Sequence, residues 1–310
     1  MKKKINLRNY MVFIAFVLLF IVLSFLSPAF LTSDNLLLVL RQISINGLIA
    51  AGMTYVILTG GIDLSVGSIL GFSSMSAVLI LNSGVPSVIA IIAALAIGTA
   101  LGLFNGFFIA KFKLQPFIVT LATVSIIRGL TLVISNSMPV SVRNGAQDYL
   151  NIGQGYFLGI PIPVYVLIIV FLLFWFILMK LPFGKKIYSI GGNEEVARLS
   201  GINTDRTKII IYGMIGFTCA LAGVILSARL GSASPQAGTG YELDAIAAVV
   251  IGGTTLAGGK GSISATFIGV LLIGILSNGL NLLGIQSEYQ NIVKGAVILL
   301  AVLIDTFKKE

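Results

Sequence analysis

Residues 184–208 read GKKIYSIGGNEEVARLSGINTDRTK, the one long polar stretch between apolar runs that also carries a helix signal. Asn193 is suited to cap a helix that begins at Glu194 and Glu195. Acidic side chains in the first turn of a helix are favoured by its dipole. The stretch therefore predicts a short helix outside the apolar part of the chain.

This predicted helix is amphipathic. Val196, Leu199 and Ser200 share one face at helical spacing. Arg198 lies near the C-terminal end, and Gly201 is a typical helix stop. Two interpretations fit: a surface loop between two membrane helices, or a docking helix offered to a cytoplasmic partner.

The composition indicates a membrane protein. Of 310 residues, 57% are hydrophobic and 10% are charged, whereas a soluble domain is about 25% charged. The chain has no histidine, so the commonest general base and metal ligand are missing. Its one cysteine, Cys219, falls within an apolar run, which excludes a disulfide within the chain. We expect no catalytic site, no metal site, no bound cofactor and no nucleic-acid partner.

Apolar runs long enough to cross a bilayer, about 17–25 residues, recur along the chain. They predict an all-α membrane protein with about ten transmembrane helices, forming a single transmembrane domain over residues 1–310. The first run has no typical signal-peptide cleavage site and is expected to be retained. The eighth run is short, so it either tilts or is partly re-entrant. The predicted spans are Met11–Leu26, Leu36–Thr59, Leu64–Leu81, Val88–Ala110, Leu114–Ile134, Pro163–Met179, Ile209–Leu230, Leu243–Leu256, Ile263–Leu283 and Tyr289–Ile304.

Basic residues assign the sides of the membrane. With the N-terminus inside, fifteen of the twenty lysines and arginines fall in inner segments, and only Arg143 falls in an outer loop. This asymmetry predicts cytoplasmic termini, a cytoplasmic segment at 181–208 and a long external loop at 135–162. Four basic residues remain in the outer parts of spans. These four are Arg41, Arg128, Arg229 and Lys294. They either snorkel outward, pair with Glu242, Asp244 or Glu288, or face an acidic external partner.

Two glycine patterns have structural interpretations. Gly98, Gly102 and Gly106 form a stripe in the fourth span that predicts close approach of a second helix. The segment IGGTTLAGGKGS at 251–262 superficially suggests a phosphate-binding loop, but its glycines do not have the required spacing around Lys260. We expect a tight inner turn there.

Ten spans allow an inverted repeat, in which spans two to five are mirrored by spans seven to ten. A weak echo supports the repeat. The sequence TGGID at 59–63 precedes the third span, and TGYELD at 239–244 precedes the eighth. Asp63 and Asp244 within these segments are either helix N-caps or gate and proton-coupling residues.

Several segments resemble the permease subunits of sugar ABC importers in the ribose/xylose/galactose branch. Together they cover nearly the whole chain, and the long ones are specific to that family. They are LTSDNLL (31–37), GMTYVILTGGIDLSVGS (52–68), GGNEEVARLSGI (191–202), AGTGYELDAIAAVVIGGTTLAGGKGS (237–262), NGLNLLG (278–284) and YQNIVKGAVILLAVLID (289–305).

The resemblance implies an inverted-repeat, type II-like permease in the bacterial cytoplasmic (inner) membrane, with ribose as the expected sugar. It also implies a second permease copy, most simply in a homodimer, a cytoplasmic ATP-binding subunit and a periplasmic or lipoprotein sugar-binding protein. Residues 232–241 and the external loops would face the binding protein. The ATPase contact would be formed by Asn193, Glu194, Glu195, Val196, Ala197, Arg198, Leu199, Ser200, Gly201 and Ile202.

A path for a sugar needs groups that replace its hydration. The candidates within spans are Asn46, Thr54, Tyr55, Phe104, Asn105, Asn278 and Asn281. For each polar one, the alternative is an interhelical hydrogen bond. Rival functions are an ion-coupled secondary sugar transporter, an integral membrane enzyme, and an ABC permease for another pentose, hexose or nucleoside.

Overall fold

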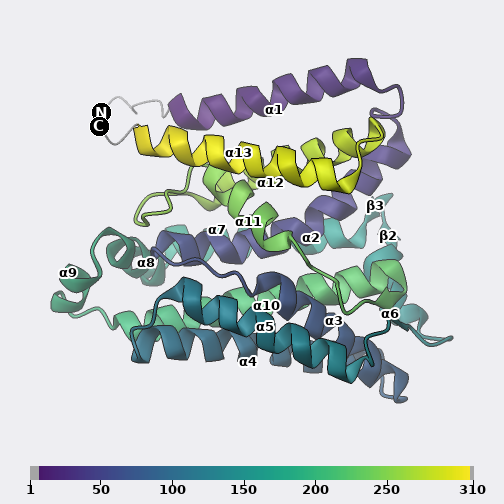
Figure 1. Cartoon of the computed structure of the whole chain (residues 1–310), viewed down its shortest axis with the longest axis horizontal. Helices are drawn as coiled ribbons and strands as arrows, with labels where there is room; N and C mark the ends of the chain where they lie inside the picture. The colour runs from purple at the N-terminus through teal and green to yellow at the C-terminus, as the bar shows by residue number, and fades with distance from the viewer. Residues whose placement is uncertain (1–6, 308–310) are drawn as a thin grey trace.

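The computed structural model describes residues 7–307, and nearly all the regular structure in this range is α-helix (Figure 1). Each predicted span overlaps a helix. The terminal lysines 2–4, 308 and 309, which contribute to the predicted topology, lie outside the described residues. The helices at the predicted spans are α1 (Leu7–Leu26), α2 (Ser33–Leu58), α3 (Val66–Asn82), α4 (Ser87–Lys111), α5 (Pro116–Ile134), α7 (Ile162–Lys180), α10 (Thr204–Leu230), α11 (Tyr241–Ile251), α12 (Ile263–Leu282) and α13 (Ser287–Phe307).

Within the described range, six helices are long and apolar enough to cross a membrane by length and composition: α2, α4, α5, α7, α10 and α12. The apolar part of α1 and helix α3 are shorter. The prediction of an all-α membrane protein is confirmed at this level.

Two helices differ from the predicted spans for local reasons. Helix α10 begins at Thr204, five residues before the predicted span, because the Asn203 side chain caps it and accepts a hydrogen bond from the Arg206 N–H at 2.9 Å. Helix α11 ends at Ile251, where Gly252 and Gly253 follow. Its 11 residues measure about 16 Å, roughly half the hydrocarbon thickness of a bilayer.

Helices α3 and α11 begin inside the bundle (Figure 1). Residues 59–65 approach the start of α3 from one end of the molecule, and residues 231–240 approach the start of α11 from the other. The second approach contacts the start of α3, because a Cβ added at Gly67 would lie 2.1 Å from the carbonyl oxygen of Gly238. Only glycine fits at such a backbone contact.

The most extensive helix–helix packing in the bundle is that of α10 on α4. A Cβ added at Gly102 would lie 2.0 Å from the Tyr212 carbonyl oxygen, and one at Gly216 would lie 2.2 Å from the Gly98 carbonyl oxygen. The glycine stripe therefore brings two helix backbones into contact, as predicted.

The two ends of the bundle carry different short elements. At one end lie α8 (Pro182–Gly192) and α9 (Glu194–Leu199), together with the start of α1 and the end of α13 (Figure 1). At the other end, residues 135–162 are ordered into short elements. The strand β1 (Val140–Ser141) pairs with β4 (Ser232–Ala233), β2 (Tyr156–Phe157) pairs with β3 (Ile160–Pro161), and α6 (Gln147–Gln154) packs on α10.

Helix α6 is fixed to α10 by Tyr149, which is fully buried. Its phenol hydroxyl shares a 2.6 Å hydrogen bond with the Ser227 hydroxyl. Burial raises the pKa of Tyr149 to about 12, so the phenol stays neutral at physiological pH. The region predicted to be the longest external loop is thus anchored to a central helix.

Candidate coupling site at one end of the bundle

Helix α9 has the cap and the stop that its sequence predicts. The Asn193 side-chain oxygen accepts a hydrogen bond from the Val196 N–H at 3.0 Å. At the other end, the N–H groups of Gly201 and Ile202 donate to the carbonyls of Arg198 and Ala197 at 3.0 and 3.1 Å. This is a Schellman motif, and Gly201 has the left-handed conformation that it requires, with φ +83°.

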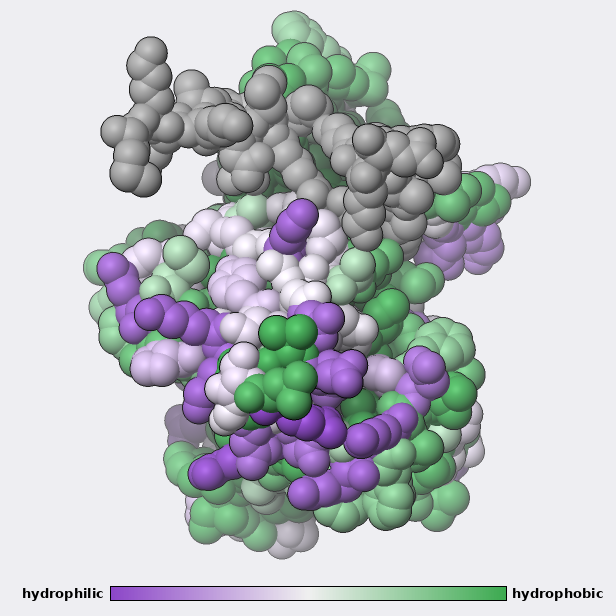
Figure 2. All heavy atoms as spheres, turned by 90° about the vertical axis from the view of Figure 1, so that its left-hand side faces the viewer, coloured by the Kyte–Doolittle hydropathy of each residue, from purple (hydrophilic) through white to green (hydrophobic). Residues whose placement is uncertain are grey.

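The apolar side chains of α9 point away from the rest of the chain. Leu199 is 82% exposed and Val196 is 57% exposed, whereas Ala197 is buried. Figure 2, which faces this end of the molecule, shows an apolar protrusion surrounded by hydrophilic residues. Exposed apolar groups with a polar rim are typical of a protein contact surface.

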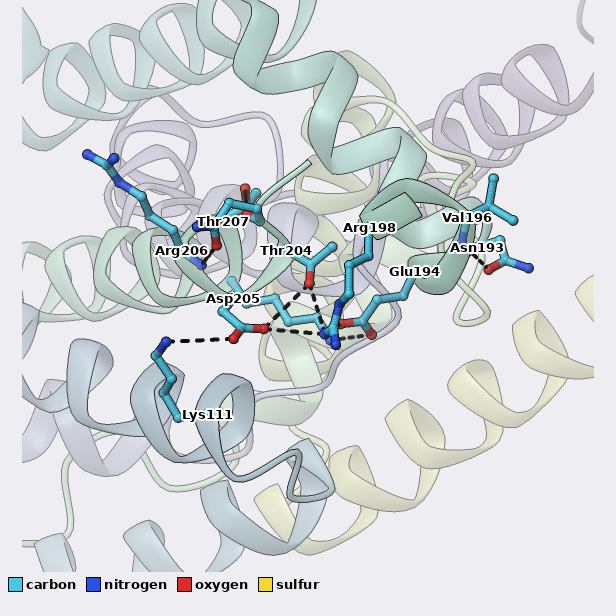
Figure 3. Close-up of polar contacts among 11 residues, drawn as sticks. Lys111, Asn193, Glu194, Val196, Arg198, Thr204, Asp205, Arg206 and Thr207 are labelled. Atoms are coloured by element: carbon cyan, nitrogen blue, oxygen red, sulfur yellow. Dashed lines mark hydrogen bonds and ion pairs between the residues drawn. The ribbon is translucent and has the colours of Figure 1, made fainter. Parts of the chain in front are cut away.

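Five side chains of alternating charge connect α9 to α10 and α4; we call them the charge network (Figure 3). They are Lys208, Glu194, Arg198, Asp205 and Lys111, in order of contact. The Lys208 ammonium lies 2.6 Å from the Glu194 carboxylate, and the Arg198 guanidinium lies 3.8 Å from the same carboxylate. Asp205 then lies 3.4 Å from Arg198 and 3.8 Å from Lys111.

A cavity of about 600 Å³ lies beside α9. Its walls come from α9, from residues 59–61 at the end of α2, from the turn between α4 and α5, and from the start of α10. Charged side chains of α9 line it together with Lys113, Lys208 and Tyr212. Helix α9 is therefore not packed tightly against the segment that leads to α3.

Helix α8, which precedes α9, is fixed against the end of α2 and the turn between α11 and α12. A Cβ added at Gly191 would lie 1.8 Å from the Leu58 carbonyl oxygen, and the Gly259 N–H donates to the same carbonyl at 2.9 Å. The Tyr188 hydroxyl donates to the Gly261 carbonyl at 2.9 Å, and burial raises the pKa of this phenol. The glycine-rich residues 252–262 form the turn between α11 and α12 that the sequence predicts.

The predicted path residue Asn105 and the predicted gate or cap residue Asp63 belong to one buried network, which joins α4 and α5 to the start of α3. Thr123 of α5 donates to the Asn105 carbonyl oxygen at 2.6 Å, and the Asn105 amide donates to Ser65 at 2.9 Å. The Asp63 carboxylate then accepts from the Ser65 N–H at 2.8 Å and from its hydroxyl. Its second oxygen has no hydrogen-bond partner among the described residues, and the same holds for the Tyr212 hydroxyl.

A second group surrounds Asp244. The Lys294 ammonium of α13 lies 2.9 Å from this carboxylate, and the Asn46 amide of α2 lies 3.4 Å from it. Of the alternatives for Lys294, the structure therefore shows pairing with Asp244. Arg128 instead donates to the carbonyls of Pro235 and Ala237 at 2.6 and 2.9 Å.

The remaining predicted path residues lie apart from one another. Most of them join neighbouring helices, and Phe104 is 49% exposed on the outer surface of α4. The contacts are Thr54 with Thr266, Tyr55 with the Phe174 carbonyl, Asn278 with Asn35, and Asn281 with Gln290. The seven predicted path residues thus do not form one site in a single chain.

The helix-cap alternative for the two acids needs correction. The N-cap position of α11 is Gly240, and Asp244 lies a turn further on, so it is not a cap. Asp63 lies two residues before Ser65, the N-cap position of α3, and accepts hydrogen bonds from the Ser65 N–H and hydroxyl. Neither acid is at the N-cap position because the helix starts differ from those that hydropathy indicates. Helix α3 begins later than its predicted span, and α11 begins earlier.

Sequence reasoning missed Asp205 and Lys111, the two residues that extend the charge network to α4. The only signal for Asp205 was its position in the first turn of α10, next to the capping Asn203. Lys111 is the last residue of α4, and its sequence indicates only a basic residue at the inner end of a predicted span.

The six long apolar helices define the class of a helical membrane protein. A family model described as "branched-chain amino acid transport system / permease component" matches residues 35–302, and the chain belongs to this family. It is thus a multi-pass protein of the bacterial cytoplasmic membrane.

Within this family, the chain is similar over most of its length to individual sugar permeases. The chain is 54% identical to the ribose import permease protein RbsC of Bacillus subtilis (strain 168), over 96% of this chain and 92% of the relative. The protein of the same name in Escherichia coli (strain K12) is 51% identical, over 96% and 93%. The xylose transport system permease protein XylH of Haemophilus influenzae is 38% identical, over 99% and 98%. No solved structure matches the chain.

Proposed function

We propose that this chain is the transmembrane subunit of an ATP-driven importer that moves ribose across the cytoplasmic membrane. The observation that carries the proposal is the sequence identity to ribose import permeases, which is 54% and 51% for the two relatives above over nearly the full length of the chain. The capped helix α9, with Val196 and Leu199 exposed, supports an ATPase docking role. Hydrolysis would take place on the separate ATP-binding subunit, so the chain itself needs no catalytic residue and no cofactor.

We further propose ten spans with both termini on the cytoplasmic side. Support comes from the location of the start of α1, the end of α13 and α9 at one end of the bundle (Figure 1). The inverted repeat is supported by α3 and α11, two short helices whose non-helical approach segments enter from opposite ends. Short or broken helices at corresponding positions of two inverted halves typically mark the substrate path.

The partner in the membrane is proposed to be a second copy. Gln236 and Thr239 are exposed in the non-helical segment 231–240, which runs through the bundle. Non-helical backbone at membrane depth is tolerated only where protein covers it or where it lines an aqueous cavity. A homodimer with the sugar path between its copies would meet this requirement.

The proposed mechanism assigns each end of the molecule a partner. At the cytoplasmic end, closure of the two ATPase subunits would displace α9 and switch the permeases between outward and inward openings. At the external end, residues 135–162 and 232–241 would receive the sugar-binding protein. Asn46, Asn105, Asp63 and Asp244 would lie near the path as gate or lining residues.

The test is reconstitution in proteoliposomes with the candidate ATPase and binding protein, followed by uptake of labelled ribose. We expect uptake that requires ATP and the binding protein. ATP-dependent uptake of xylose in preference to ribose would retain the importer and change its sugar. Ribose uptake driven by a proton gradient without ATP would overturn the proposal in favour of a secondary transporter.

A further inference from the structure

The geometry points to Asp205 as the positioning residue that holds α9 in register with the α4–α10 pair, so that displacement of α9 reaches the membrane helices. This inference rests on the proposed function and adds to it the residue that links the docking helix to the bundle. Asp205 acts through Arg198 and is not itself a docking residue.

Helix α9 cannot hold its position by itself. It has six residues, too few for a helix to be stable without tertiary contacts. Ala197 is its only fully buried residue, and the cavity of about 600 Å³ lies on one side. Its position therefore depends on its two connections and on the charge network.

The charge network reaches α10 at two points. One is the Glu194–Lys208 pair at 2.6 Å. The other is Arg198, whose guanidinium lies 3.4 Å from Asp205 and donates to the Thr204 hydroxyl at 3.2 Å. Two separated attachments restrain the direction of a short helix as well as its location.

Asp205 links the α9 part of the network to α4. One carboxylate oxygen faces Arg198 of α9, and the other lies 3.8 Å from Lys111 at the end of α4. Figure 3 shows the Asp205 side chain between these two cations. Because α4 and α10 are in backbone contact through Gly102 and Gly216, a force on Asp205 acts on both helices together.

The pairs contribute little to stability. The Lys111 and Asp205 side chains are 56% and 30% exposed, and Arg198 is 45% exposed. Exposed ion pairs are screened by solvent and contribute little to the free energy of unfolding. Loss of Asp205 should therefore leave the fold intact and change only how motion is transmitted.

The experiment uses the reconstituted importer and the isosteric variant Asp205→Asn. We expect ribose-stimulated ATP hydrolysis to continue while ribose transported per ATP falls at least about threefold. Asp205→Glu, which keeps the charge, should restore most of the ratio. Asp34→Asn, an exposed aspartate in the first turn of α2, is the matched control and should not change it.

A second measurement does not depend on transport. A nitroxide on Ser200→Cys reports the motion of α9, since Cys219 is buried and does not compete for the label. We expect the rotational correlation time of the label to fall about twofold in Asp205→Asn and not in Asp34→Asn. An immobile label in Asp205→Asn, or an unchanged ribose-to-ATP ratio in a working importer, would overturn the inference. If unaltered protein moves no ribose, the proposed function fails, and the label still decides the role of Asp205.

Discussion

The Lys294 ammonium lies 2.9 Å from the Asp244 carboxylate, so an ion pair joins α13 to α11. The two side chains are 19% and 7% exposed. Loss of one partner from a buried pair leaves an uncompensated charge and costs about 3–5 kcal/mol. Lys294→Met should therefore lower the thermal midpoint of the detergent-solubilised protein by several degrees.

The double variant Lys294→Met/Asp244→Asn serves as the control for this prediction. It removes both charges, and we expect it to recover most of the lost stability. A double variant no more stable than Lys294→Met would show that the two residues do not interact in the folded protein. The same variants also examine ion coupling, because a proton-coupled carrier would lose gradient-driven uptake when Asp244 is neutralised.

Docking through α9 predicts a defined effect of its most exposed residue. Leu199→Ser should weaken binding of the ATP-binding subunit about tenfold, because an apolar anchor at an interface contributes about 1–2 kcal/mol. Binding is measured by titration of the ATPase onto nanodisc-embedded permease. Leu158→Ser alters a residue 84% exposed at the other end and should leave the affinity unchanged. Equal effects of both variants would argue against a role of α9.

The C-terminal stop of α9 predicts local unfolding without global loss. Gly201 has φ +83°, so Gly201→Ala costs about 1 kcal/mol or more at this position. We expect the amides of α9 to exchange with deuterium about fivefold faster. Gly192 has no heavy atom within 4 Å of an added Cβ, so Gly192→Ala is the matched control. If the α9 amides of Gly201→Ala exchange as slowly as those of the unaltered protein, the glycine at the C-terminal end of α9 is not needed for the stability of this helix.

Local signals explain why α9 could be predicted from sequence and the charge network could not. Asn193 and Gly201 act on their own helix through bonds to residues three or four positions away. Asp205, in contrast, depends on how α10 and α4 lie side by side, since its partner Lys111 is distant in sequence. The sequence around Asp205 does not indicate that Lys111 is its partner, and the sequence around Lys111 does not indicate Asp205.

The difference between local signals and contacts between helices also explains which features of the spans and of the predicted path residues could be predicted. Hydropathy locates apolar runs, and each run overlaps a helix. It does not indicate that α11 stops at Ile251 or that α3 and α11 begin inside the bundle. Polar residues such as Thr54 and Asn278 were correctly located in helices, but their neighbours Thr266 and Asn35 are set by helix packing. The structural alternative of interhelical hydrogen bonds therefore holds for these two.

The packing of α10 on α4 makes a prediction about the glycine stripe. A Cβ at position 102 would overlap the Tyr212 carbonyl, so Gly102→Ala must separate two helices that touch through backbone atoms. We expect folded yield in detergent to drop severely, since overpacking costs about 1–3 kcal/mol or more. Gly295→Ala in α13, where no heavy atom lies within 4 Å, should fold normally. Normal yield for Gly102→Ala would contradict the observed contact.

Two threonines of α5 provide the sharpest comparison for the buried network. Thr123 donates to Asn105 across helices, whereas Thr131 donates only to the Ile127 carbonyl of its own helix. Both are buried. Thr123→Val leaves the Asn105 oxygen unpaired, at a cost of about 1–3 kcal/mol, while Thr131→Val leaves no side chain without its partner.

We therefore expect Thr123→Val to lower the unfolding midpoint in denaturant clearly more than Thr131→Val. Because Asn105 also holds Ser65, and Ser65 holds Asp63, the substitution should also alter the segment that leads into α3. Ribose uptake should then fall by a larger factor than binding of the ATPase, since the docking helix is untouched. Equal losses in the two threonine variants would mean that the network neither stabilises the bundle nor shapes the path.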